Sequence, residues 1–177
     1  MAELKKKEFK DLYADSRGGW DPTERECQLD TDLELLLPDH YINFVEERLR
    51  IYRELNGLTD ESQLEAYSAG LEDRFGPLPV QAVQLMTSLR LRWLGQSLGF
   101  DKVVLKGGKL LAYFPEEAHE APPQEVLMRF LDKLQSQPQR YRMKQNGPRI
   151  SLVMESVPTV DAAFVLLSQL SSAEELA

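Results

Sequence analysis

The sequence predicts an α+β fold: a three-helix unit followed by a hairpin, a helix, a second hairpin and a second helix. Apolar residues recur every three or four positions from about residue 39 to residue 98, which is the period of amphipathic helices. From residue 101, short apolar runs flank Gly-Gly and Asn-Gly pairs, which are typical of hairpin turns. We therefore expect a four-stranded antiparallel sheet with its two helices on one face.

The beginning of the chain looks unlike a packed domain. Residues 1–28 are rich in charge and contain Gly18-Gly19 and Asp21-Pro22, so we interpret them as a linker or tail ahead of a domain at 29–177. The stretch 28–37 then alternates carboxylates with leucines, which indicates an extended segment laid against another part of the chain. Within the domain we expect a helical half, 38–99, and an α+β half, 100–175.

Three helices are predicted in the helical half. The first runs from about 39 to 56, and its apolar face consists of Tyr41, Val45, Leu49, Tyr52 and Leu55. The second begins after Asp60, which can cap it together with Gln63, and it ends at Gly76, where a left-handed residue is needed. Pro77 prevents continuation, and the third helix occupies about 79–98.

The α+β half is predicted to contain two hairpins. Strands at 102–106 and 109–114 are joined by Gly107-Gly108, and a helix follows at about 124–135. Strands at 140–144 and 149–154 are joined around Asn146-Gly147, and a final helix begins near residue 158. Pro148 favours an edge position or a late start for the second of these strands.

One residue of the corner between the second and third helices, 72–79, indicates function. Asp73 lies in the last helical turn, where its carboxylate opposes the macrodipole at a cost of roughly 0.3–1 kcal/mol. Two interpretations are open. Asp73 forms a local ion pair with Arg74 or with an arginine of a neighbouring helix, or it presents its carboxylate to a cationic partner.

Composition limits the functional classes. The chain of 177 residues has a net charge of −8 and a pI near 4.9, which argues against an autonomous surface for duplex DNA. Cys27 is the only cysteine, so a disulfide framework and a thiolate metal site are excluded and an intracellular location is favoured. Since the sequence has no signal peptide and no stretch that could cross a bilayer, we expect a soluble cytoplasmic protein without membrane contact.

No catalytic template fits the sequence. The glycine-rich turn at 106–109 lacks the spacing of a phosphate-binding loop, and His40 and His119 form no metal-binding pair. We therefore predict a domain that is not an enzyme and has no metal and no cofactor. The alternative is an accessory DNA-binding module, because arginines cluster at 48–53 and 90–92. Interleaved glutamates, however, favour pairing within the helices.

Four motifs together resemble the C-terminal domain of the bacterial transcription-repair coupling factor. They are LPDHYI at 37–42, RLRIYR at 48–53, DRFGPLP at 73–79, and LRLR at 89–92 followed by LGF at 98–100. The resemblance covers about residues 30–170. It implies a larger parent protein, an ATP-dependent DNA translocase that displaces stalled RNA polymerase and recruits nucleotide excision repair. ATP and magnesium would act in the parent's motor domains.

The resemblance also implies a regulatory role for this domain. In that family the C-terminal domain packs on the UvrB-like N-terminal module of the same protein and masks the surface that recruits UvrA. The contact uses the aspartate of the DRFG motif and a glutamate three positions earlier, against cationic residues of the module. Asp73 matches the aspartate, but Gly70 stands at the second position. Glu72 is a candidate substitute, although it is rotated by about 100° around the helix.

Overall fold

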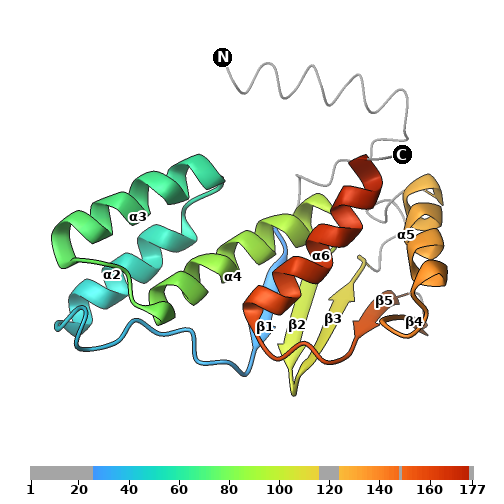
Figure 1. Cartoon of the computed structure of the whole chain (residues 1–177), viewed down its shortest axis with the longest axis horizontal. Helices are drawn as coiled ribbons and strands as arrows, with labels where there is room; N and C mark the ends of the chain where they lie inside the picture. The colour runs from blue at the N-terminus through green and yellow to red at the C-terminus, as the bar shows by residue number, and fades with distance from the viewer. Residues whose placement is uncertain (1–25, 116–123, 148, 176–177) are drawn as a thin grey trace, which may run out of the picture.

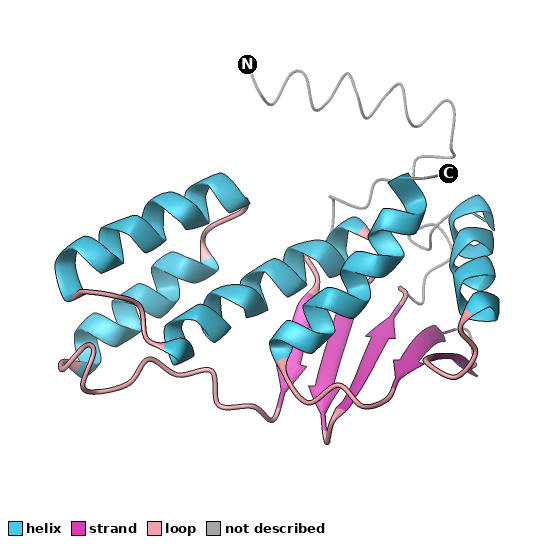
Figure 2. Cartoon of the chain, in the orientation of Figure 1, coloured by secondary structure: helices cyan, strands magenta, loops and turns pink. Residues whose placement is uncertain are grey.

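The structure is a computed structural model that describes residues 26–115, 124–147 and 149–175 (Figures 1 and 2). Its elements in chain order are β1 (Gln28–Thr31), α2 (Val45–Asn56), α3 (Glu61–Phe75), α4 (Val80–Ser97), β2 (Lys102–Lys106), β3 (Lys109–Tyr113), α5 (Gln124–Ser136), β4 (Tyr141–Asn146), β5 (Arg149–Met154) and α6 (Val160–Glu175). Three helices precede two hairpin-plus-helix units. The predicted α+β class is confirmed.

The sheet has five strands, not four, in the order β1-β2-β3-β5-β4. The four strands of the hairpins pair antiparallel as predicted. The extended segment adds the fifth strand: β1 pairs parallel with β2, and Gln28 lies opposite Lys102. The prediction of a purely antiparallel, four-stranded sheet was wrong on this point. The alternation of leucines and carboxylates predicts an extended segment, but it does not identify the strand that the segment joins.

Both predicted hairpin turns are present. Gly107 and Gly108 have φ angles of 59° and 73°, and Gly147 has a φ of 62°, values that favour glycine. β5 lies between β3 and β4, so the edge position suggested by Pro148 was wrong, whereas the late start at Arg149 agrees. Pro148 itself lies outside the described residues. An interior position is possible because the strand's first hydrogen-bonded residue follows the proline.

Helices α4, α5 and α6 cover the same face of the sheet (Figure 1). The sequence predicted two helices on this face, and the structure adds α4 as a third. This long helix serves two cores. Leu91 and Leu98 pack with the sheet, α5 and α6, whereas Met86 and Leu89 pack with α2 and α3. Cys27 is also buried in the sheet core, so the folded region includes residues just before the predicted boundary at 29.

Helix α2 starts six residues later than predicted. The carbonyl oxygen of Pro38 accepts hydrogen bonds from the backbone N–H groups of Tyr41 and Ile42, and this turn precedes the helix. The predicted apolar face is wrong for Val45 and Leu49, which are 58% and 52% exposed. The physical reason is that the buried positions of α2 lie in its later turns, where the helix packs against α3 and α4.

Candidate functional site

The corner between α3 and α4 is held by backbone and side-chain contacts. At the other end of α3, the carboxylate of Asp60 accepts a hydrogen bond from the backbone N–H of Gln63, 2.8 Å away, which confirms the predicted cap of this helix. At the corner itself, Gly76 has a φ of 93°, and its N–H donates to the carbonyl oxygen of Glu72 over 2.9 Å. The hydroxyl of Tyr41 donates to the carbonyl oxygen of Gly76, also over 2.9 Å. The corner is therefore held by a backbone bond within α3 and by a side chain from the turn before α2.

The cation next to Asp73 is engaged elsewhere. Arg74 forms an ion pair with Glu47 of α2 over 2.6 Å, and its guanidinium lies 4.8 Å from the ring centroid of Phe75. Asp73 is exposed and forms no hydrogen bond or ion pair with any other described residue. The local pair between Asp73 and Arg74 is therefore not formed, and neither is a pair with an arginine of a neighbouring helix. A cation that approaches from outside finds an unpaired carboxylate in the last turn of α3.

The two other positions of the predicted contact differ in their surroundings. Gly70 lies on the exposed surface of α3, and a β-carbon added there would meet no atom within 4 Å. Glu72 is exposed beside Tyr41. Burial first and the negative charge of Glu72 second raise the pKa of Tyr41. The helix therefore carries two acidic groups in its last turn and open space at position 70, where the resemblance predicts a glutamate.

Apolar side chains are exposed on the elements that border this corner. Phe44, Val45 and Leu49 lie at the start of α2, and Phe44 is 74% exposed. Val80 and Val83, at the start of α4, are 65% and 42% exposed. The start of α2 and the end of α3 lie at the left end of the molecule in Figure 1, and a loop leads from there to the start of α4. Exposed apolar groups around a charged group are typical of a protein–protein contact surface.

Three of the five arginines that suggested DNA binding, Arg48, Arg50 and Arg90, form ion pairs with carboxylates. Arg50 contacts Glu47 and lies 3.9 Å from Glu54. Arg90 binds Glu61 through Nε and Nη2 at 2.8–3.0 Å. These carboxylates would have to be displaced before the guanidinium groups could contact phosphates. The predicted pairing within the helices is confirmed for Arg50, whereas Arg90 of α4 pairs with a glutamate of α3.

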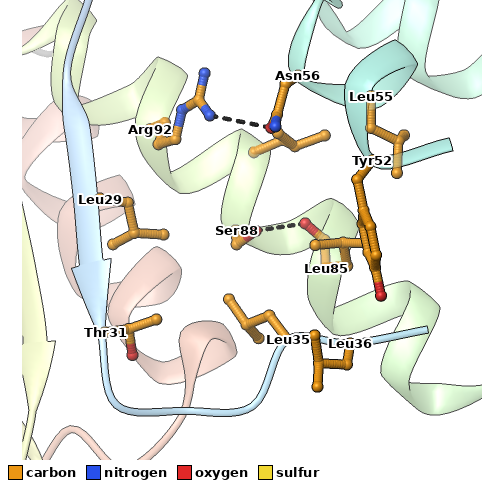
Figure 3. Close-up of a pocket in the computed structure, with 11 residues that line it drawn as sticks. Leu29, Thr31, Leu35, Leu36, Tyr52, Leu55, Asn56, Leu85, Ser88 and Arg92 are labelled. Atoms are coloured by element: carbon orange, nitrogen blue, oxygen red, sulfur yellow. Dashed lines mark hydrogen bonds between the residues drawn. The ribbon is translucent and has the colours of Figure 1, made fainter. Parts of the chain in front are cut away.

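A groove of about 290 Å³ lies between the two cores (Figure 3). It is lined mainly by leucines of β1, the segment after it, α2 and α4. Its polar residues are held in local contacts: Ser88 donates to the carbonyl oxygen of Leu85, and Arg92 lies 3.5 Å from the side chain of Asn56. None of the described residues that line the groove is a histidine, cysteine or carboxylate. The hydroxyl groups that line it, those of Thr31, Tyr52 and Ser88, are engaged in hydrogen bonds with backbone groups.

Other reactive groups do not assemble a site within the described part of the chain. Cys27 is buried, and burial, followed by the charge of Asp101, raises its pKa to about 12, while Arg92 lowers it. No group of three metal-binding side chains occurs among the described residues, and His119 lies outside them. No helix in the described ranges is long and apolar enough to cross a membrane. The exposed features of the corner therefore remain as the candidate functional site.

Comparison with protein families assigns the chain. The model of the TRCF domain matches residues 31–125, which is more than half of the chain. This chain belongs to the TRCF domain family. The match includes the corner with Asp73 and the whole of the three-helix unit.

Curated relatives with significant similarity are transcription-repair-coupling factors. The chain is 35% identical to that of Escherichia coli strain K12 over 130 residues, which is 72% of this chain and 10% of the relative. It is 24% identical to that of Haemophilus influenzae over 152 residues, 79% of this chain and 13% of the relative. The chain thus spans about a tenth of the length of these TRCF proteins.

A solved structure supports the fold. It is described as the crystal structure of the C-terminal domain of transcription-repair coupling factor. The two structures share a TM-score of 0.62 at 16% sequence identity, over 85% of this chain and 95% of the other. The arrangement of helices and strands in this TRCF domain therefore has a counterpart in a solved C-terminal domain.

Proposed function

We propose that this TRCF domain is a non-catalytic regulatory element of a transcription-repair coupling factor, and that its acidic corner docks on the UvrB-like N-terminal module of the same protein. Docking would mask the surface of that module that recruits UvrA. The parent would be a cytoplasmic, ATP-dependent DNA translocase that displaces stalled RNA polymerase. ATP and magnesium would be bound by its motor domains, outside this chain.

The observation that supports the proposal is that Asp73 is exposed and has no ion-pair partner among the described residues. The adjacent Arg74 could neutralise its carboxylate and instead bridges to Glu47. A negative charge in the last turn of a helix is unfavourable for the isolated domain. A cationic partner would offset this cost. The exposed apolar side chains of Phe44 and Val80 would supply buried area around the charge.

The test is a calorimetric titration of the domain into its UvrB-like module, with two charge reversals. Asp73→Arg should weaken binding by at least about tenfold, which corresponds to roughly 1.4 kcal/mol. The fold should survive, because a cation is favourable at the end of a helix. Asp132→Arg, a reversal at an exposed position of α5, is the matched control and should bind like the unmodified domain. Equal binding of all three proteins would exclude Asp73 from the interface.

A further inference from the structure

The second face of the sheet carries a pattern of its own. Helices α4, α5 and α6 pack on one face of the sheet. Alternate side chains of each strand point to the opposite face, and no described helix covers that face. In a sheet with one face in water, outward positions are normally polar. Here the three central positions of the middle row are apolar: Val104 lies opposite Leu111, and Leu111 lies opposite Val153. The row ends in charged residues, Asp30 opposite Val104 and Arg142 opposite Val153. Val104 and Leu111 are half-buried, and Val153 is 9% exposed.

Cationic residues border this apolar row on both sides. On one side the register places Lys102 next to Tyr113, and Ser151 lies between Tyr113 and Lys144. On the other side Lys106 lies opposite Lys109. The face carries six cationic residues in all: Lys102, Lys106, Lys109, Arg142, Lys144 and Arg149. Four carboxylates accompany them: those of Asp30, Asp101 and Glu155 in ion pairs, and that of Asp32, which accepts a hydrogen bond from the backbone N–H of Gly107 beside Lys106. A face with an excess of positive charge is unexpected in a chain with a net charge of −8.

The carboxylates leave part of this charge without a partner. Asp30 pairs with Lys106 over 3.0 Å, and Glu155 lies 2.6 Å from Arg142 and 3.6 Å from Lys109. Lys102 and Lys144 form no ion pair with any described residue. They stand in one row beside the apolar stripe, Lys144 at its end and Lys102 next to Gln28 of the edge strand β1. The potential of the face is therefore positive along an edge of the stripe.

The surface is also hollow. A depression of about 240 Å³ is lined by Lys109, Leu111, Arg142, Met143, Lys144 and Val153. Its floor therefore includes two residues of the apolar row, and its rim includes three cations. Two residues along a strand span about 6.7 Å, so the cationic rows stand about 13 Å apart. This separation is close to the diameter of an α-helix with its side chains, about 10–12 Å.

We infer that the uncovered face of the sheet docks an acidic amphipathic helix of a partner protein. The apolar side chains of the helix would lie on Val104, Leu111 and Val153, and its flanking carboxylates would meet Lys102 and Lys144 on one side and Lys109 on the other. The inference goes beyond the proposed function. The surface is cationic, it lies on the sheet, and it does not include the acidic corner of Asp73.

Nucleic acid fits this face less well than an acidic helix. Phosphates could pair with the lysines, but the row between them offers valine and leucine instead of aromatic rings on which bases stack. Tyr113, the one aromatic residue that the register places in these outward rows of the described strands, lies 4.9 Å below the guanidinium of Arg149. A bound nucleic acid would leave the apolar stripe unfilled. An amphipathic helix fills the stripe and neutralises the lysines together.

The experiment uses the 177-residue chain and three fluorescent probes. The first is a helical peptide with a leucine stripe flanked by glutamates, the second has lysines in place of the glutamates, and the third is duplex DNA. Anisotropy titrations should show binding of the acidic peptide, and affinities for the other two probes at least about tenfold weaker. Added salt should weaken binding of the acidic peptide, because exposed charges are screened.

Variants locate the site. Lys102→Glu combined with Lys144→Glu should weaken binding of the acidic peptide by at least about tenfold. Leu111→Thr, which keeps a residue suited to a strand, should weaken it several-fold. Arg53→Glu, a reversal at an exposed position of α2, is the matched control and should change nothing. The inference is overturned if the acidic peptide does not bind, if the sheet variants bind it as well as the control does, or if DNA binds this face more tightly.

Discussion

The hydroxyl of Tyr41 donates a hydrogen bond to the carbonyl oxygen of Gly76, 2.9 Å away and 35 residues later in the chain. The ring of Tyr41 also packs against Phe75, with a centroid distance of 5.9 Å. These two contacts join the turn before α2 to the end of α3. They hold in place the helical turn that presents Asp73.

Replacing Tyr41 with phenylalanine should lower the free energy of unfolding by about 1 kcal/mol, the typical contribution of one hydrogen bond. The ring contact with Phe75 would remain. Urea unfolding followed by circular dichroism measures the change. Tyr113→Phe is the control, since its hydroxyl has no hydrogen bond with any described residue, and its effect should be smaller. Equal effects of the two substitutions would contradict a structural role for the Tyr41 hydroxyl.

The same tyrosine predicts a loss of stability at high pH. Its pKa is raised by burial and by Glu72, so the native state holds the phenol proton more tightly than the unfolded chain does. This contribution is complete below the unfolded pKa of about 10, and it is lost as the pH rises above that value. Urea midpoints measured from pH 8 upward should fall above about pH 10. The fall should be shallower in Tyr41→Phe, but not absent, because burial raises the pKa of Tyr67 and Tyr141 as well.

Gly70→Glu should strengthen docking on the UvrB-like module. The substitution adds a carboxylate one helical turn before Asp73, at a position where a β-carbon meets no neighbour within 4 Å. Gly70→Gln is the matched control, because it gives the same helix-forming gain of roughly 0.5–1 kcal/mol without the charge. Calorimetry should show tighter binding only for Gly70→Glu. If both variants bind equally, position 70 takes no part in the electrostatic contact.

The corner shows what the sequence could predict about the site. The cap at Asp60, the positive φ angle of Gly76 and the place of Asp73 in the last turn of α3 follow from local helix rules, although the ψ of Gly76, −173°, lies outside the left-handed helical region. Arg74 and Glu47 are 27 residues apart in the sequence. Their pairing could not be predicted, because it depends on how α2 packs against α3. Yet this pairing decides that Asp73 is free of its neighbour. The local rules identify the residue, and the tertiary contact determines its state.

In the sheet, too, the local features could be predicted from the sequence and the long-range contacts could not. The hairpin turns follow from glycine pairs, since their φ angles are a local property. The parallel pairing of β1 with β2 joins residues about 74 positions apart, as in the hydrogen bond from the Thr31 hydroxyl to the carbonyl oxygen of Leu105. No turn signal marks such a contact. The start of α2 was misplaced for a related reason: Tyr41 fits the helical period, but its side chain is used to hold the corner.

Gly95→Ala should destabilise the domain by about 1–3 kcal/mol, although alanine is the better helix former by about 1 kcal/mol. A β-carbon at Gly95 would lie 3.0 Å from Sγ of Cys27 and 3.2 Å from Cγ2 of Val103, both buried. Thermal or urea unfolding measures the loss. In a Cys27→Ala background the loss should shrink, because the closer of the two clashes is removed. Additive effects of Gly95→Ala and Cys27→Ala would show that α4 does not press on this cysteine.

Cys27 should resist alkylation in the native protein. Its pKa is raised to about 12, first by burial and then by Asp101, so the reactive thiolate is scarce at pH 8. In urea the thiol returns to its ordinary pKa of about 8.5, and the thiolate fraction rises by about a thousandfold. Timed reaction with iodoacetamide, read by mass spectrometry, should therefore be slow without urea and fast with it. Gly95→Ala should speed the native reaction, since the new methyl group displaces the sulfur. Rapid alkylation of the unmodified native chain would mean that the segment at the start of β1 opens while the rest stays folded. That result would separate this strand from the core in which Cys27 is buried and against which Leu29 packs.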